Sequence, residues 1–246
     1  MQINNEKILF SPSDLIDFMD SSFVSHMERL VLTNPEFKKF IDPVDPLLSA
    51  LQSKGYAHEE NFLKSLDFSN NEICKIKKTN KGQMFSGTKK AMNEGKEIIY
   101  QAYLENKRFG GIADFLKKIP GTSSLGNYHY EVWDTKLSKK MKPYFAIQLS
   151  CYSELLYGIQ KKYPERFSII LGNNEKISLK LSDYYSYYTE LKNNFFQFHK
   201  DWKPNNFPDP GDFSNNGKWS NYAENLLQEK RHLRLVANIT KGQIRA

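Results

Sequence analysis

Three short segments near the middle of the chain decide the fold: EIIYQAYLE (97–105), GGIADFLKK (110–118) and NYHYEVWDTK (127–136). All three are rich in aromatic and β-branched residues, which are common in strands. The stretches that separate them, Asn106-Lys107 and 120–127, have turn-forming composition. Short apolar runs bounded by turns are typical of successive strands. The sequence therefore predicts a β-meander at the centre of the fold.

Helical patterns and two more strands lie on either side of this meander. Ser11-Pro12 begins a helix predicted at about 12–32, because Ser is a good N-cap and Pro suits a first helical turn. Further helices are predicted at 47–54, 57–66, 143–161 and 182–200, and further strands at 167–172 and 176–181 around the turn Gly172-Asn173-Asn174. This order predicts an α/β fold with a central mixed β-sheet flanked by helices, and with helical additions at the N- and C-terminal ends.

The composition excludes several classes of protein. Of the 246 residues, 39% are hydrophobic and 14% aromatic, which is enough to bury a core. Only Cys74 and Cys151 are present, so a disulfide framework and any four-thiolate zinc or iron–sulfur site are excluded. No apolar run approaches the roughly 20 residues of a membrane span, and the first residues do not resemble a signal peptide. We therefore expect a soluble, cytoplasmic protein without a membrane partner.

The chain is moderately basic. Lys and Arg number 35 against 28 Asp and Glu, which gives a net charge of +7. This excess fits a polyanionic partner such as a nucleic acid. It is concentrated in the segment 72–96 and the loop 138–142. The candidates for contacts with a phosphate backbone are Lys89, Lys90, Lys139 and Lys140, although lysine runs are equally common on solvated surfaces.

The segment Glu131–Lys136 (EVWDTK) carries the most informative polar residues. Residues two apart in a strand point to the same face, so Asp134 and Lys136 should project together while Thr135 points away. Glu131 should face away from Asp134 for the same reason. A carboxylate beside an ammonium group is most often a plain surface pair, so this motif by itself does not establish catalysis.

Asp114 adds a second carboxylate from the preceding strand, where it shares a face with Ile112 and Leu116. Neighbouring strands can bring Asp114 close to Asp134. Two carboxylates at short range repel each other, and a divalent cation that prefers oxygen ligands, such as Mg²⁺, relieves the repulsion. The alternative is that both acids pair with nearby lysines.

Two helical segments could complete this site. Gln148 and Tyr152 are four residues apart, so they lie on one face of the predicted helix 143–161, where the alternative is ordinary core packing. His58 and Glu59 lie in the other segment, and Glu59 could supply another carboxylate ligand. The second His of a zinc-protease helix is missing, which disfavours that kind of zinc site. The alternative for Glu59 is a solvated helix face.

Five motifs carry a resemblance to a known family: SPSDL (11–15), GYAHEENFL (55–63), GGIADFL (110–116), YEVWDTKL (130–137) and QLSCY (148–152). Together, and in this order, they resemble the RecB-like branch of the PD-(D/E)XK nuclease superfamily, as found at the N-terminus of bacterial helicase–nuclease proteins. The match spans most of the chain. The combination of D-x-K with Q-x-x-x-Y is fairly specific.

The resemblance implies a restriction-endonuclease-like core and a Mg²⁺-dependent DNA nuclease in which Mn²⁺ would substitute. The implied metal-site residues are Asp114, Asp134, Glu59 and His58. Lys136 would orient the attacking water or steady the developing charge, and Gln148 and Tyr152 would contact DNA and help to position the site. The iron–sulfur cluster of some relatives needs four cysteines, so none is expected here.

Residues 1–203 would then form the nuclease domain, and 204–246 a loop and helical tail that leads into a further domain. The expected partners are DNA, including single-stranded DNA, and a helicase domain or subunit. The aromatic residues of 184–198 could stack on unpaired bases or belong to the core. Two alternatives stay open: a nucleic-acid-binding or assembly module with this fold but no activity, and a sequence-specific restriction enzyme. The sequence does not decide whether the substrate is DNA or RNA, or whether the enzyme is an exonuclease or an endonuclease. It also does not decide whether the protein acts in repair or in phage defence.

Overall fold

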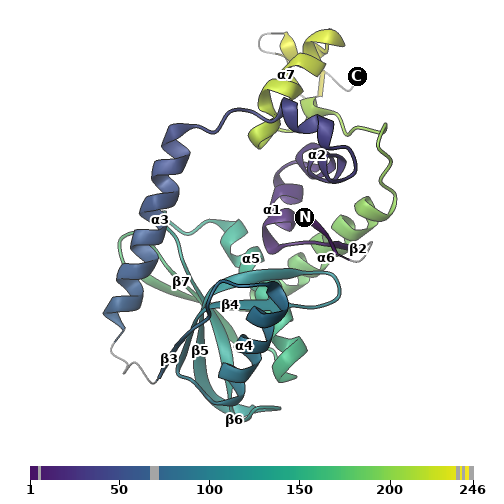
Figure 1. The fold of residues 1–246 in the computed structure, drawn as a ribbon. Helices are drawn as coiled ribbons and strands as arrows, with labels where there is room; N and C mark the ends of the chain where they lie inside the picture. The colour runs from purple at the N-terminus through teal and green to yellow at the C-terminus, as the bar shows by residue number, and fades with distance from the viewer. Residues whose placement is uncertain (5–6, 67–71, 237–238, 240–241, 244–246) are drawn as a thin grey trace. The chain divides into compact units, whose positions relative to one another are not determined.

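The computed structural model describes residues 1–246 except 5–6, 67–71, 237–238, 240–241 and 244–246 (Figure 1). The chain divides into two compact units. The sheet unit comprises Leu9–Pro12 and Leu47–Glu190, and the helical unit comprises Met1–Ile8, Ser13–Pro46 and Leu191–Ala246. The limits of these two units differ from the domain boundary predicted at 203/204. That boundary stays a prediction.

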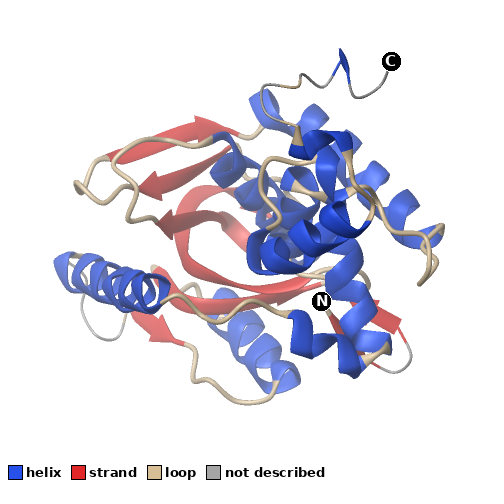
Figure 2. Ribbon diagram, turned by 90° about the horizontal axis from the view of Figure 1, so that it is seen from above, coloured by secondary structure: helices blue, strands red, loops and turns tan. Residues whose placement is uncertain are grey.

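A six-stranded mixed sheet forms the centre of the sheet unit (Figure 2). In their order across the sheet, the strands are β3 (Ile73–Lys75), β4 (Ile98–Glu105), β5 (Gly110–Ser123), β6 (Gly126–Thr135), β7 (Arg166–Ile170) and β8 (Lys176–Lys180). The pairs β3–β4 and β6–β7 are parallel, and the other neighbours are antiparallel. The predicted central mixed sheet is thus confirmed, and the predicted meander is β4, β5 and β6.

Three helices of the sheet unit flank this sheet: α3 (Pro46–Ser65), α4 (Lys81–Asn93) and α5 (Pro143–Gln160) (Figure 1). Helix α5 forms the crossover between the parallel strands β6 and β7, because parallel neighbours need a long connection. Lys161 ends this helix in the left-handed conformation, with φ of 54°. Helix α3 packs Phe62 and Leu63 against Phe115 of β5, which fixes the helix to the sheet and positions its polar residues.

The helical unit has its own apolar core. Its elements are β1 (Gln2–Asn4), β2 (Lys7–Leu9), α1 (Pro12–Asp20), α2 (Ser22–Thr33), η1 (Pro35–Phe40), the second half of α6 (Ser182–Lys200), η2 (Pro210–Asp212), η3 (Gly217–Trp219), α7 (Ser220–Glu229) and η4 (Leu233–Leu235). The buried residues of the core are Phe23, Val24, Met27, Leu30, Trp219 and Ala223. Trp219 donates its indole N–H to Glu28 at 2.7 Å, so this buried ring keeps a hydrogen bond.

Two predicted helix boundaries near the N-terminus are wrong. The helix predicted at 12–32 is interrupted, because the Ser21 side chain accepts a hydrogen bond from the Val24 N–H and begins a new helix. The helices predicted at 47–54 and 57–66 are the single helix α3, which continues through Gly55.

The basic segment 72–96 shows no clear periodicity in the sequence, yet it forms β3 and α4. The side chain of Asn80 accepts a hydrogen bond from the Gln83 N–H and caps α4. Helix α7 accounts for part of the helical tail predicted within 204–246, and some of that tail lies outside the described residues. None of the helices in the described part of the chain has both the length and the apolar character that crossing a membrane requires.

Candidate active site

An ion pair between Asp134 and Lys136 lies where β6 ends. Lys136 Nζ stands 2.7 Å from Asp134 Oδ2, and the lysine and aspartate side chains are 22% and 5% exposed. The backbone N–H of Lys136 donates to the carbonyl of Ile170 on β7 at 2.8 Å, so the extended backbone continues past the end of the strand. The alternation of an extended chain therefore brings both side chains to one face, which agrees with their predicted orientation.

Helix α5 adds Gln148 to this pair. Its side-chain Oε1 accepts a hydrogen bond from Lys136 Nζ at 3.1 Å. Pro143 stands in the first turn of α5, so the helix begins shortly after β6 and carries Gln148 back to the end of that strand. The ammonium group of Lys136 is thus held between a carboxylate of its own strand and an amide of the next helix.

Asp114 reaches the same place from β5. The pairing of β5 with β6 ends at Phe115 and Trp133, and Asp114 and Asp134 are the next residues beyond this pair on the two strands. Asp114 Oδ2 accepts two hydrogen bonds from Thr135, one from the backbone N–H at 2.9 Å and one from the hydroxyl at 3.0 Å. Thr135, which the sequence predicts to point away from Asp134 and Lys136, thus contacts the other aspartate, Asp114. β6 ends at this residue, and the Asp114 carboxylate replaces a backbone carbonyl as the acceptor.

Glu59 approaches the acids from α3 and is only 6% exposed. The side-chain amide of Gln101 on β4 donates to Glu59 Oε1, and the Tyr100 side chain also forms a hydrogen bond with Glu59. Gln101 has a positive φ of 56°, which is uncommon for a residue other than glycine and interrupts the regular pairing of β4 with β5 beside Asp114. The sequence analysis missed Gln101; the available signal was a single polar residue within the apolar strand EIIYQAYLE.

The three carboxylates interact electrostatically. Burial raises the pKa of Asp114 well above its ordinary value, and the negative charges of Asp134 and Glu59 raise it further. Burial also raises the pKa of Glu59, with a contribution from Asp134 that opposes the hydrogen bonds from Gln101 and Tyr100. These effects couple the charges of Glu59, Asp114 and Asp134, which come from a helix and two strands.

Lys136 carries a positive charge in this site. Burial by itself lowers the pKa of a lysine, but the neighbouring Asp134 and Asp114 outweigh this effect, so the pKa of Lys136 is raised. A lysine with a raised pKa keeps its proton at neutral pH and acts as a cation rather than as a base. The ammonium group of Lys136 therefore interacts with the carboxyl groups of Asp134 and Asp114.

The donor set fits a hard divalent cation such as Mg²⁺ or Mn²⁺, which prefers carboxylate oxygens. Asp134 Oδ2 is buried and accepts no well-directed hydrogen bond from the described residues; its contact with Lys136 is an ion pair. Asp114 Oδ2 is already bonded to Thr135, which leaves Oδ1 for a ligand. No three His, Cys, Asp or Glu side chains among the described residues are gathered closely enough to form a ready-made metal cluster.

His58 and Tyr152, which were also predicted for this site, are not bonded to the acids by any hydrogen bond among the described residues. His58 is partly buried beside Glu59 on α3, and its Nε2 has no hydrogen-bond partner in the described part of the chain. Tyr152 is 5% exposed and donates its hydroxyl to the carbonyl of Ile112 at 2.7 Å. A Cβ atom at Gly111 would stand 2.8 Å from this hydroxyl, so the glycine permits the close approach of α5 to β5. Tyr152 therefore holds the strand that carries Asp114.

The predicted phosphate-contacting lysines are all exposed. Lys89 and Lys90 lie on α4, where Lys90 stands 3.8 Å from Glu94, and Lys139 and Lys140 lie in the loop before α5. This exposure is compatible with a nucleic acid surface and equally with solvation.

Tyr56 and Lys78 lie nearer to the acids, and the sequence analysis missed both. Tyr56 is 66% exposed on α3, one turn before Glu59, and Lys78 Nζ stands 5.8 Å from the centre of its ring. The charge of Lys78 also lowers the pKa of Glu59, so this lysine is close to the site. Nothing in the sequence distinguishes these residues, because their exposure and proximity depend on packing.

No protein-family model matches the chain, and no curated protein sequence matches it. The resemblance to RecB-like nucleases therefore stays a prediction that depends on the motifs and on the geometry of this site.

Proposed function

We propose that the sheet unit is a metal-dependent DNA nuclease domain with a restriction-endonuclease-like core, similar to the RecB-like PD-(D/E)XK enzymes. The observation that carries the proposal is the ion pair of Asp134 with Lys136, to which the charge of Asp114 is coupled, with Glu59 electrostatically coupled to the two aspartates. Buried carboxyl groups that repel one another destabilise a fold, so their retention at one strand end is explained best by a cation that they bind.

Each residue has a role in phosphodiester hydrolysis. Asp114, Asp134 and Glu59 would hold a divalent ion. When bound, Mg²⁺ polarises a phosphate oxygen and lowers the pKa of a bound water. Lys136 would orient the attacking water or donate a hydrogen bond to a phosphate oxygen, and its charge would stabilise the negative charge that develops. Gln148 keeps Lys136 in place, and His58, beside Glu59, is a further candidate ligand.

The basic surface would bind the substrate. Lys78 and Tyr56 stand beside the acids, and the exposed lysines of α4 and of the loop 138–142 would contact the phosphate backbone farther away. DNA is the proposed substrate, and a helicase domain or subunit is the proposed partner.

The proposal is tested by cleavage of end-labelled DNA with Mg²⁺, with Mn²⁺ and with EDTA. Asp134→Asn and Lys136→Met should each lower the cleavage rate by at least about 100-fold, because each removes one charge from the reacting centre. Single-stranded DNA, double-stranded DNA and RNA of one sequence should be compared, which also distinguishes end degradation from internal cutting.

Glu131→Gln is the matched control. Glu131 is a buried acid of the same strand, 8% exposed, whose carboxylate accepts the backbone N–H of Arg166 rather than lying among the acids. This variant should cleave at the wild-type rate, and circular dichroism should show that all variants are folded. Wild-type cleavage by Asp134→Asn would contradict the proposal. Binding of DNA without metal-dependent cleavage would favour the binding module.

A further inference from the structure

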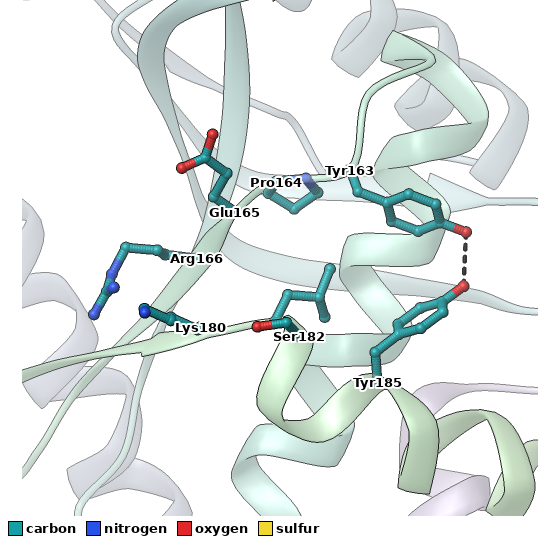
Figure 3. Close-up of a pocket in the computed structure, with 8 residues that line it drawn as sticks. Tyr163, Pro164, Glu165, Arg166, Lys180, Ser182 and Tyr185 are labelled. Atoms are coloured by element: carbon teal, nitrogen blue, oxygen red, sulfur yellow. Dashed lines mark hydrogen bonds between the residues drawn. The ribbon is translucent and has the colours of Figure 1, made fainter.

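A pocket of about 470 Å³ opens in the sheet unit away from the acids, between β7, β8 and the start of α6 (Figure 3). Its lining residues are Tyr163, Pro164, Glu165, Arg166, Lys180, Leu181, Ser182 and Tyr185. The volume lies within the range of sites for small molecules and cofactors. Figure 3 shows Tyr163 and Tyr185 at one end of the pocket and Arg166 and Lys180 at the other.

The aromatic end is a rigid wall. The hydroxyl groups of Tyr163 and Tyr185 are 2.7 Å apart and share a hydrogen bond. The ring of Tyr163 stacks on Tyr157, with centroids 4.3 Å apart and planes 10° apart. Tyr185 in turn contacts the fully buried ring of Tyr188. Side chains that are ordered before binding lose little conformational entropy when a ligand arrives.

The other end gathers positive charge. Arg166 and Lys180 are direct partners across the antiparallel pair β7–β8, so their side chains leave the same face of the sheet. Arg166 is fixed there, since its Nε and Nη2 donate to the hydroxyl and the carbonyl of Ser178, both at 2.8 Å. Like charges at directly opposite positions destabilise a sheet. Glu165 lines the pocket and the buried Glu131 lies beside Arg166, and an anionic ligand in the pocket would add a negative partner for both Arg166 and Lys180.

We propose that this pocket binds a nucleoside phosphate, with the base against the wall of Tyr163 and Tyr185 and the phosphate at Arg166 and Lys180. Every nucleobase has a face that can stack on an aromatic ring, and a guanidinium group binds phosphate through paired N–H groups. The ligand is either a free nucleotide or one nucleotide of a single strand, which share this chemistry.

The pocket is separate from the acids. The register of β6 and β7 pairs Trp133 with Ser168, which puts Arg166 beside Glu131, three residues before Asp134. That spacing corresponds to roughly 10 Å along the strand. The inference therefore does not rest on the proposed nuclease activity.

The test is equilibrium binding in EDTA, which removes any contribution from metal-dependent cleavage. The probes are AMP and adenosine, measured by calorimetry, and a fluorescein-labelled short oligo(dA), measured by fluorescence anisotropy. Tyr163→Ala should raise the dissociation constant about tenfold, which is within the range of single stacking contacts. Lys180→Ala should raise it by a similar factor, because it removes one charged contact with the phosphate. Adenosine should bind more weakly than AMP because it lacks the phosphate.

The control variants are Tyr187→Ala and Lys107→Ala, which change an exposed tyrosine of α6 and an exposed lysine outside the pocket. Both should bind like the wild type. Tighter binding of AMP identifies a site for free nucleotides, and tighter binding of oligo(dA) identifies a site for single strands. Either result supports the proposal if the pocket variants weaken the binding of that probe. The proposal is overturned if neither probe binds in the millimolar range, or if the control variants weaken binding as much as the pocket variants. Lys180 is exposed on the edge strand, so Lys180→Ala tests the pocket even if Tyr163→Ala does not fold.

Discussion

Replacement of Asp114 by Asn should stabilise the protein in the absence of metal, although it should remove the proposed activity. Asn has the same shape as Asp, and its side-chain oxygen can still accept the N–H and hydroxyl of Thr135. What the substitution removes is a negative charge near Asp134 and Glu59. The prediction therefore separates the effect of charge from the effect of hydrogen bonding.

The size of the effect follows from the register. Asp114 and Asp134 are the next residues beyond the last pair of β5 and β6, and Cβ atoms at facing positions of two strands are about 5 Å apart. Two unit charges about 6 Å apart at an effective dielectric constant of about 20 repel by about 3 kcal/mol. The loss of attraction to Lys136 offsets part of this gain. We expect a net increase of about 1 to 2 kcal/mol in the free energy of unfolding near neutral pH.

The effect should depend on pH. The pKa of Asp114 is raised in the folded state, so this residue destabilises the fold progressively as pH rises above its unfolded-state pKa of about 3.9. Asn does not titrate. Wild type and Asp114→Asn should therefore be almost equally stable near about pH 4, and the difference should grow toward neutral pH. Urea unfolding in EDTA at both pH values measures this.

Added Mn²⁺ should reverse the order of stability, so that the wild type becomes more stable than Asp114→Asn. A ligand that binds only the folded state at about a hundredfold excess over its dissociation constant stabilises it by about 2.7 kcal/mol. Wild type should gain this and Asp114→Asn should gain much less. Glu60→Gln is the control, because Glu60 is an exposed acid paired with Lys64 and should change stability by less than about 0.5 kcal/mol. If Asp114→Asn is no more stable than wild type in EDTA near neutral pH, the three carboxyl groups do not repel as inferred.

Three further outcomes are expected. Gln160→Ala should lower the free energy of unfolding, measured in urea titrations, by about 3 kcal/mol. The buried amide of Gln160 is hydrogen-bonded to the backbone N–H and carbonyl of Tyr130, and both groups would lose their partner. A loss below about 1 kcal/mol would show that water replaces the amide. Asp17→Asn should stabilise the protein at neutral pH and flatten its pH dependence. Burial raises the pKa of Asp17 to about 6, so this residue lowers the stability progressively between its unfolded-state pKa of about 3.9 and about pH 6, and the whole loss is present at neutral pH. Equal pH profiles for the two proteins would contradict this. Tyr56→Ala should weaken binding of single-stranded DNA about tenfold with little loss of stability, because the exposed ring lies beside Lys78 and could stack on a base; unchanged affinity would place the DNA elsewhere.

Local signals in the sequence were sufficient for most of the sheet and its main helices. The meander follows from the alternation and the turns of 97–136, and α5 follows from Pro143 and the apolar run behind it. Local signals failed to predict α3 and α4 correctly, because in both segments the preferences of individual residues disagree with the structure that packing favours. Gly55 lies inside α3 although glycine disfavours helices, and α4 forms in a basic segment because Asn80 caps it and Met84 and Met92 are buried.

The sequence by itself was sufficient to select the residues that meet at the candidate site: Asp114, Asp134 and Lys136, with Gln148 one helix later. The spacing of Asp134 and Lys136 within one strand is enough to predict that their side chains share a face, because side chains in a strand alternate with a period of two. Only the tertiary structure decided that Asp114 and Asp134 both follow the last pair of β5 and β6, that Thr135 turns to Asp114 and that Gln101 holds Glu59. These contacts depend on strand register, on the end of β6 and on one residue with positive φ, and none of these leaves a periodic trace in the sequence. For the same reason the sequence does not predict the pocket that Tyr163 and Arg166 line, because its lining residues come together only when the sheet and α6 pack.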